Sequence, residues 1–249
     1  MLYPFILTLL AGLSTMIGTL PIFVSFKNEK KLIASACSFA AGVMIAVSIL
    51  DLIPTSINYL RIGNNNGYVI LLCFIFIILG IILATLLDSL VDKISTGNNL
   101  FNVGILSMIV IILHNIPEGI VTYVVSNKNI LLGISLCIAI ALHNIPEGIS
   151  IAIPIYYSTK SKIKAIIYTL ISALSEFFGA ILTYLFLSHF ISNNVLGFIL
   201  ALTAGIMIAI SFEKLIPTGN SYNNKLAKIF FIIGFIFMII SLLLNNLIS

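Results

Sequence analysis

Apolar runs of membrane-spanning length follow one another along this chain, separated by short polar breaks. A helix of about 20 apolar residues crosses the roughly 30 Å hydrocarbon core of a bilayer. The runs are continuous rather than alternating, which is typical of membrane helices and not of barrel strands. We therefore predict an all-α, polytopic membrane protein, with a single transmembrane domain over residues 1–249. The eight expected transmembrane helices lie near Leu2–Phe26, Leu32–Leu60, Tyr68–Val91, Leu100–Val125, Ile130–Tyr157, Ile163–Phe190, Val195–Pro217 and Leu226–Ile248.

Composition agrees with a bilayer location, because 60% of the residues are hydrophobic and only 8% are charged. Membrane proteins concentrate Lys and Arg in loops, which accounts for the net charge of +4 without an anionic partner. We expect a multi-pass protein of the cell membrane and no nucleic-acid partner. Cys37, Cys73 and Cys137 all lie within apolar segments, so we interpret them as small buried residues.

The basic residues predict the orientation, since Lys and Arg are retained on the cytoplasmic side. Arg61 and Lys128 follow even-numbered segments. The remaining basic residues lie in or beside the connections 1–2, 3–4, 5–6 and 7–8, on the opposite side: Lys27, Lys30, Lys31, Lys93, Lys160, Lys162, Lys164, Lys214, Lys225 and Lys228. Both termini are therefore expected outside.

Two internal repeats predict the architecture. Leu113–Ile120 and Leu142–Ile149 are identical and fall on the fourth and fifth segments. The pattern of residues 41–48 and 52–55 recurs without gaps in residues 204–211 and 215–218, on the second and seventh segments. Those two segments cross in opposite directions, as inverted repeats of secondary transporters do. We expect an inverted repeat of helices 1–3 and 6–8 around a central 4–5 pair.

Five of the eight acids lie within apolar spans: Asp51, Glu118, Glu147, Glu176 and Glu213. A carboxylate at the bilayer centre costs on the order of 2.5–3.5 kcal/mol, so such residues mark functional sites. The central segments supply no Lys or Arg to neutralise them. We infer that protons or a bound cation provide the counter-charge.

The duplicated motif has the spacing of a metal site. His114 and Glu118 lie one helical turn apart on one face, with Asn115 three residues before Glu118. His143, Asn144 and Glu147 repeat this arrangement on the fifth segment. Imidazole, carboxylate and amide donors without a thiolate suit Zn²⁺, Fe²⁺ or Mn²⁺ better than Cu⁺ or Ca²⁺. Two metals bridged by Glu118 and Glu147 would fit the same residues.

The depth of each acid follows from the helical rise of 1.5 Å per residue. His114 and His143 come out roughly 18–21 Å from the outer face, and Glu176 about 18 Å from the inner one. Asp51 falls near the outer mouth and Glu213 near the inner mouth. We interpret these two as acids on a pathway through the central cluster, with ordinary interfacial carboxylates as the alternative.

The doubled His-Asn-Ile-Pro-Glu-Gly at residues 114–119 and 143–148 resembles the ZIP family of zinc and iron transporters, closest to its bacterial ZupT-like branch. The resemblance covers essentially the whole chain. It implies zinc uptake into the cell by alternating access, with Fe²⁺ and Mn²⁺ as related substrates and no cofactor. It also implies a zinc set of His114, Glu118, His143 and Glu147, and an iron-type or second-metal set of Asn115, Glu118, Asn144, Glu147 and Glu176.

Other positions match the family less closely. Ser48 and Ser211 resemble pathway positions. Phe177 follows Glu176 where many relatives have Pro, which puts the geometry around Glu176 in question. The loop Ser95–Asn99 lacks the His-rich insert of some members, and His189 has no acidic neighbour, so an interfacial position is expected for it.

Two other function classes remain open. An intramembrane metalloenzyme would use the same ligands to activate water, but the chain lacks His-Glu-x-x-His. A cation channel would not need the duplicated histidine. A homodimer is compatible with all three readings.

Overall fold

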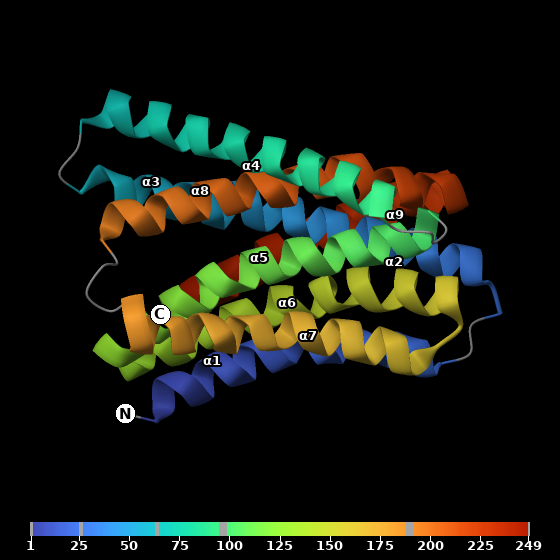
Figure 1. Ribbon diagram of the computed structural model, residues 1–249, viewed down its shortest axis with the longest axis horizontal. Coiled ribbons are helices and arrows are strands. Elements are labelled where there is room, and N and C mark those ends of the chain that lie inside the picture. The colour runs from blue at the N-terminus through green and yellow to red at the C-terminus, as the bar shows by residue number, and fades with distance from the viewer. Residues whose placement is uncertain (1, 25–26, 63–64, 95–98, 188–191, 249) are drawn as a thin grey trace.

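The computed structural model describes residues 2–24, 27–62, 65–94, 99–187 and 192–248, and every regular element within them is helical. The helices lie side by side along the long axis of the molecule (Figure 1). In chain order they are α1 (Tyr3–Leu13), the 3₁₀ helix η1 (Ser14–Phe23), α2 (Glu29–Val47), the π-helix η2 (Ser48–Leu52), α3 (Ile53–Arg61), α4 (Asn66–Ile94), α5 (Asn99–Lys128), α6 (Ile130–Thr159), α7 (Lys162–Leu182), the π-helix η3 (Thr183–Leu187), α8 (Asn193–Ile210), the π-helix η4 (Ser211–Leu215) and α9 (Ile216–Ile248).

The described residues contain seven helices that are long and apolar enough to cross a membrane. The last of these runs from Asn193 to Leu244 and contains 52 residues, which is about 78 Å of helix and far more than a bilayer is thick. Asn223 interrupts it with φ −165° and ψ 96°. The Asn223 side chain accepts a hydrogen bond from Leu226 N at 3.1 Å, as an N-cap residue does. A new helix therefore begins after Asn223.

The seventh helix does not end at Pro217, where the sequence pattern predicted its end. The helix continues through Pro217, which stands at the start of α9, and breaks at Asn223 instead. Proline has no N–H to donate, and the widened π-turn η4 immediately before it accommodates the lost bond. Pro54 follows the π-turn η2 in the same register. The expected helix Leu32–Leu60 is thus one rod with a local widening.

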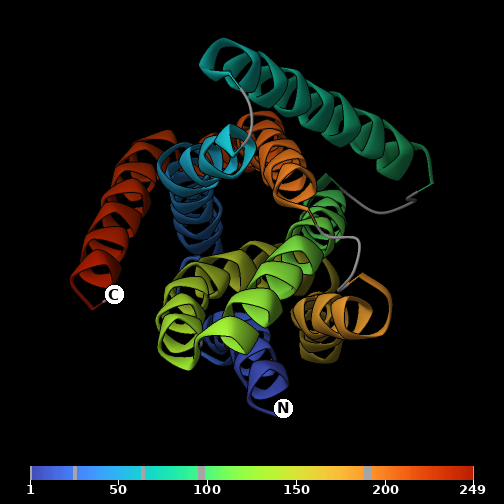
Figure 2. The ribbon, with the colours of Figure 1, turned by 90° about the vertical axis from the view of Figure 1, so that its left-hand side faces the viewer.

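The helices form two groups. In the first, α2 packs along α9 and α4 along α8, with α3 against α8. In the second, α5 packs along α6 and α7, while α1 and η1 pack against α6 and α7. The end-on view shows the first group above the second (Figure 2). Contacts of α6 with α2 and α9, and of α5 with α8, join them.

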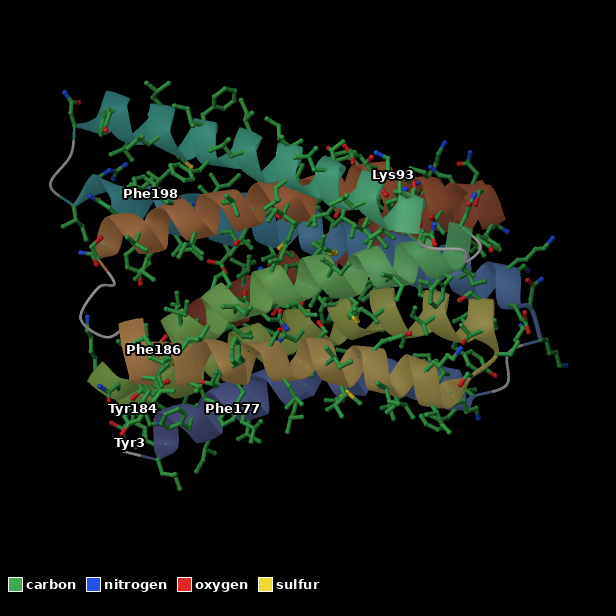
Figure 3. The ribbon with its side chains drawn as sticks, in the orientation of Figure 1. Tyr3, Lys93, Phe177, Tyr184, Phe186 and Phe198 are labelled. Carbon is green, nitrogen blue, oxygen red and sulfur yellow. The ribbon has the colours of Figure 1, made fainter. Side chains whose placement is uncertain are left out.

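The outer surface of the bundle is apolar over most of its length. Phe178, Phe186 and Leu131 expose at least half of their surface. Figure 3 shows apolar side chains of this kind pointing away from the helices, with Lys93 at the end of the bundle opposite to Tyr3 and Phe198. A surface of this composition is suited to lipid.

Close helix contacts place the second group around the duplicated motif. A Cβ at Gly119 of α5 would overlap the carbonyl oxygen of Glu176 on α7. A Cβ at Gly148 of α6 would overlap the carbonyl oxygen of Thr15 in η1. Small residues let membrane helices approach closely. The glycine that ends each motif therefore allows a neighbouring helix to pack directly against the motif.

We predict that Gly119→Ala lowers the thermal stability of the detergent-solubilised protein. Its methyl group forces α5 away from α7, and overpacking of this kind costs about 1–3 kcal/mol. Gly67→Ala is the matched control, because no atom lies within 4 Å of a Cβ there. Thermal unfolding followed by size-exclusion chromatography measures both. Equal midpoints for the two variants would contradict the packing argument.

Candidate metal centre

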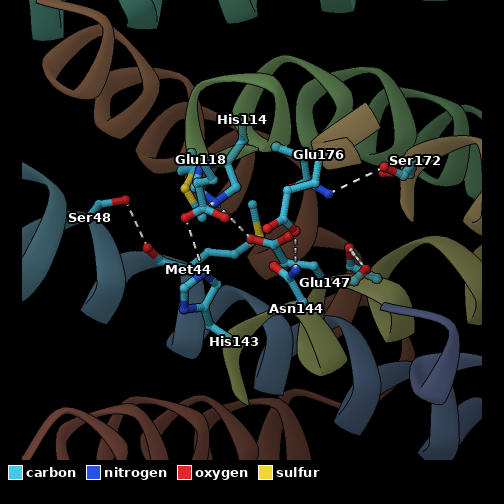
Figure 4. A network of polar contacts seen from close by, with 12 residues as sticks. Met44, Ser48, His114, Glu118, His143, Asn144, Glu147, Ser172 and Glu176 are labelled. Atoms are coloured by element: carbon cyan, nitrogen blue, oxygen red, sulfur yellow. Dashed lines mark hydrogen bonds and ion pairs between the residues drawn. The ribbon is translucent and has the colours of Figure 1, made fainter. Parts of the chain in front are cut away.

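The structure buries all seven residues that the sequence predicted as metal ligands. They come from three neighbouring helices, and each exposes 6% or less of its surface: His114, Asn115 and Glu118 from α5, His143, Asn144 and Glu147 from α6, and Glu176 from α7. Figure 4 shows the polar groups of six of them, all but Asn115, converging between the helices. The structure thus brings the seven candidate ligands together in one buried cluster.

Two histidines and two glutamates form a chain of contacts across α5 and α6. His114 Nε2 lies 3.2 Å from Glu118 Oε1 and 3.2 Å from Glu147 Oε1. His143 Nε2 lies 3.1 Å from the same Glu118 Oε1. Glu118 therefore contacts both histidines, one from its own helix and one from the next.

These separations suit coordination of a single small cation. Zinc bonds of about 2.0–2.2 Å in a tetrahedron place neighbouring ligand atoms roughly 3.3–3.5 Å apart. The observed nitrogen to oxygen distances of 3.1–3.2 Å are close to this spacing. Ligand atoms of His114, Glu118 and His143 all lie within 4.8 Å of one another. Little movement is needed for them to hold a metal ion.

The other half of the cluster offers only oxygen atoms. Asn144 Nδ2 donates to Glu176 Oε2 at 3.0 Å and to the carbonyl oxygen of Ala11 at 3.0 Å. Asn115 Nδ2 donates to the carbonyl oxygen of Ser172 at 3.3 Å. These bonds turn the amide nitrogens toward neighbouring helices. Several buried oxygens have no hydrogen-bond partner: Asn115 Oδ1, Glu118 Oε2, Asn144 Oδ1, Glu147 Oε2 and Glu176 Oε1.

The charge balance of the cluster is unfavourable without a cation. Among the described residues, no lysine or arginine forms an ion pair with Glu118, Glu147 or Glu176. Burying a carboxylate without a paired charge is costly, and each unpartnered oxygen adds a desolvation penalty of about 1–3 kcal/mol. Binding a divalent cation, or taking up protons, removes most of this cost.

Backbone carbonyl groups also bind the side chains of the site, and the sequence motifs do not predict them. The carbonyl oxygens of Ala11 and Ser172 orient the two asparagine amides. No sequence signal identifies such acceptors, because every residue carries a carbonyl group. The partner of Asp51 could have been predicted from the sequence. Thr55 stands four residues after Asp51 on the same helical face, and its hydroxyl donates to Asp51 Oδ1 at 3.1 Å.

Asp51 lies beside the metal cluster rather than only at a distant mouth. A cavity of about 70 Å³ is lined by Asp51 and Thr55 together with Glu118 and His143. Asp51 is half-buried there. Asp51 therefore shares one cavity with two of the candidate metal ligands.

Glu213 lies in a different environment, away from the cluster. It lines a polar cavity of about 580 Å³ together with Asp92, Lys214 and Lys30, and it accepts a hydrogen bond from Thr85 at 3.2 Å. Lys214 Nζ binds Asp88 Oδ1 at 2.6 Å and Asp92 Oδ2 at 3.4 Å. The sequence did not predict that this lysine joins the two acids of α4 to η4.

The remaining predicted positions have simpler surroundings. Ser48 and Ser211 are buried, and each donates its hydroxyl proton to the carbonyl group four residues earlier at 2.8 Å. Neither bonds to the carboxylates, although Ser48 lies beside the cluster in Figure 4. Helix α7 continues unbroken through Phe177. The ring centroids of Phe177 and Phe5 are 6.1 Å apart. His189 and residues 95–98 of the predicted loop lie outside the described residues.

The chain is similar to known transport proteins over nearly its whole length. The family model described as ZIP zinc transporter matches residues 1–100 and 96–242. Proteins named zinc transporter ZupT from Streptococcus mutans and Clostridium perfringens are 36% and 35% identical to it, and the matches cover 96% and 98% of this chain and 96% of each relative. A protein of the same name from an Enterobacter strain is 38% identical over 87% of this chain and 86% of its own length. Similarity of this extent shows that the chain belongs to the ZIP zinc transporter family.

Proposed function

We propose that this protein takes up Zn²⁺ across the cytoplasmic membrane through the buried His–Glu cluster of α5 and α6. The observation that carries the proposal is the set of three buried carboxylates without a basic partner, two of them in contact with histidine. Membership of the family and the relatives named zinc transporter support zinc as the cargo. The chain acts as a transporter rather than as an enzyme, and the metal ion is its substrate rather than a cofactor.

The two halves of the cluster differ in the metal that they favour. His114, His143, Glu118 and Glu147 combine nitrogen and oxygen donors, which zinc prefers. Asn115, Asn144 and Glu176 contribute oxygen donors only, which suits Mn²⁺ and, as a related divalent ion, Fe²⁺. Glu118 and Glu147 each keep one buried oxygen unpartnered, so each carboxylate is able to bridge two ions. Fe²⁺ and Mn²⁺ transport belongs to this proposal.

We propose eight membrane crossings, the seventh and eighth separated at Asn223, with an inverted repeat of helices 1–3 and 6–8. Packing supports the repeat. In it α2 corresponds to α8 and α9 corresponds to α4, and the structure contains both equivalent contacts, α2 with α9 and α8 with α4. At the first contact a Cβ on Gly42 would overlap the carbonyl oxygen of Phe231, and at the second a Cβ on Gly205 would overlap that of Ile77. The two π-turns, η2 and η4, stand in the same register of the repeat.

Alternating access would move the two helix groups against each other. The metal ligands belong to the second group, whereas Asp51 and Glu213 belong to the first, on the widened turns η2 and η4. Such movement would change which acid lies next to the cluster. All seven ligands come from one chain, so the proposal holds equally for a single copy and for a homodimer.

A channel is the main alternative to a transporter. The closely spaced ligands argue against it, because an ion held by several buried donors leaves slowly, and conduction needs weak sites.

We expect Glu147→Ala to abolish zinc accumulation in proteoliposomes. The substitution removes one contact of His114 and a carboxylate of both metal sets. Glu29→Ala is the control, since Glu29 is an exposed acid that pairs only with Lys160 among the described residues. Wild-type vesicles that accumulate no divalent metal would refute transport, and flux that does not saturate with zinc concentration would establish a channel.

The double variant His114→Ala with His143→Ala tests the division of the cluster. Without imidazole ligands, zinc accumulation should fall at least about tenfold relative to that of Mn²⁺, because only oxygen donors remain. Competition between ⁶⁵Zn²⁺ and unlabelled Mn²⁺ measures the ratio, with Asn115→Ala as the matched loss of an oxygen donor. An unchanged ratio would show that the histidines do not select the metal.

Orientation is tested by labelling introduced cysteines. The lysine-rich side is expected in the cytoplasm, with both termini outside. Cysteine in place of Lys162 should therefore react with a membrane-impermeant maleimide only after permeabilisation, and cysteine in place of Lys128 should react in intact cells. The three natural cysteines are buried. The reverse pattern would invert the topology.

A further inference from the structure

A continuous groove runs along α2 from the level of the apolar core to the lysine-rich end of the bundle. Two cavities form it, and they share Leu32, Ser35 and Phe230 as lining residues. Shared lining residues make the two spaces neighbours. They differ in chemistry, so the groove has an apolar part and a basic part.

The apolar part has a volume of about 240 Å³, and Ser35 is the one polar residue among its described lining residues. Helices from both groups form it, with α2 and α9 on one side and η1 and α6 on the other. Its remaining lining residues are Pro21, Ala36, Phe39, Ile149 and Ile153. In a membrane this space faces hydrocarbon, so its natural occupant is an acyl chain.

The basic part has a volume of about 430 Å³ and is lined by Lys27, Asn28 and Lys31. No acid lines it. Glu29 is absent from its described lining, and the Glu29 carboxylate binds Lys160 Nζ at 2.7 Å. Among the described residues, neither Lys27 nor Lys31 forms an ion pair. Two uncompensated ammonium groups thus stand at the polar end of an apolar groove.

We propose that this groove binds one anionic phospholipid, with an acyl chain in the apolar part and the phosphate beside Lys27 and Lys31. Charge complementarity identifies the headgroup, since basic residues next to the membrane attract anionic lipid. The attached apolar space identifies a lipid rather than free phosphate, which would leave that space without an occupant. This binding does not depend on the function proposed above.

The position of the groove suggests what the lipid does. A chain lodged between α2 and α9 on one side and α6 on the other contacts both helix groups at once. Helix α6 carries His143 and Glu147. If the groups move during transport, the bound lipid changes the relative stability of their arrangements. This second step rests on the proposed function, whereas lipid binding itself does not.

The test is native mass spectrometry of the full chain released from micelles that contain equal amounts of phosphatidylglycerol and phosphatidylcholine. Wild-type protein should retain one phosphatidylglycerol in preference to phosphatidylcholine. In the double variant Lys27→Gln with Lys31→Gln the preference should fall roughly 30-fold, because each lysine near the membrane surface contributes about 1 kcal/mol toward anionic lipid. Lys93→Gln with Lys164→Gln is the control, since it removes the same charge from exposed lysines that do not line the groove.

A second variant tests the apolar part independently. Ser35→Phe places a ring where the two cavities meet and leaves the charge unchanged. It should reduce retention of both lipids, whereas the lysine variant should reduce retention of phosphatidylglycerol alone. The proposal is wrong if the lysine variant keeps the wild-type preference, or if the control variant loses as much of it. It is also wrong if Ser35→Phe retains lipid as the wild type does. None of these measurements requires zinc transport.

Discussion

The constraint on which the rest of this structure depends is the burial of three carboxylates, Glu118, Glu147 and Glu176, without a lysine or arginine to pair with them. The two histidines of the cluster carry a compensating charge only when protonated. A bound cation or protons from outside the chain would offset this cost, and the cluster keeps buried oxygen atoms without hydrogen-bond partners. The metal binding that we propose would offset the same charge imbalance that makes the site costly to fold.

The fold keeps this cluster intact by close packing. Each motif ends in a glycine, and at Gly119 and Gly148 the backbone of a neighbouring helix occupies the place of a side chain. This contact brings Glu176 of α7 against α5, and the carbonyl oxygens of Ala11 and Ser172 against the asparagine amides. The seven candidate ligands therefore belong to the second group of helices, while Asp51 and Glu213 belong to the first group.

The lipid proposed for the groove along α2 would link the bilayer to the contact between the two helix groups. It opens at the lysine-rich end and reaches the apolar seam where the first group meets α6. Lipid composition would then act on the protein at the boundary between its two helix groups. The ion pairs of Lys214 with Asp88 and Asp92 tie α4 to η4 near another cavity, so charged contacts also join elements within the first group.

The amino-acid sequence by itself determined the helical membrane class and the duplicated motif, and it predicted seven candidate ligands, because helical periodicity places His114 and Glu118 on one face whatever surrounds them. It could not determine which atoms meet across helices. The sharing of Glu118 between both histidines, the approach of Asp51 to the cluster and the helix break at Asn223 rather than Pro217 all depend on packing. Long-range contacts arise from the mutual fit of whole helices, and no local pattern encodes that fit. Tertiary structure alone turned two copies of a motif into a single site.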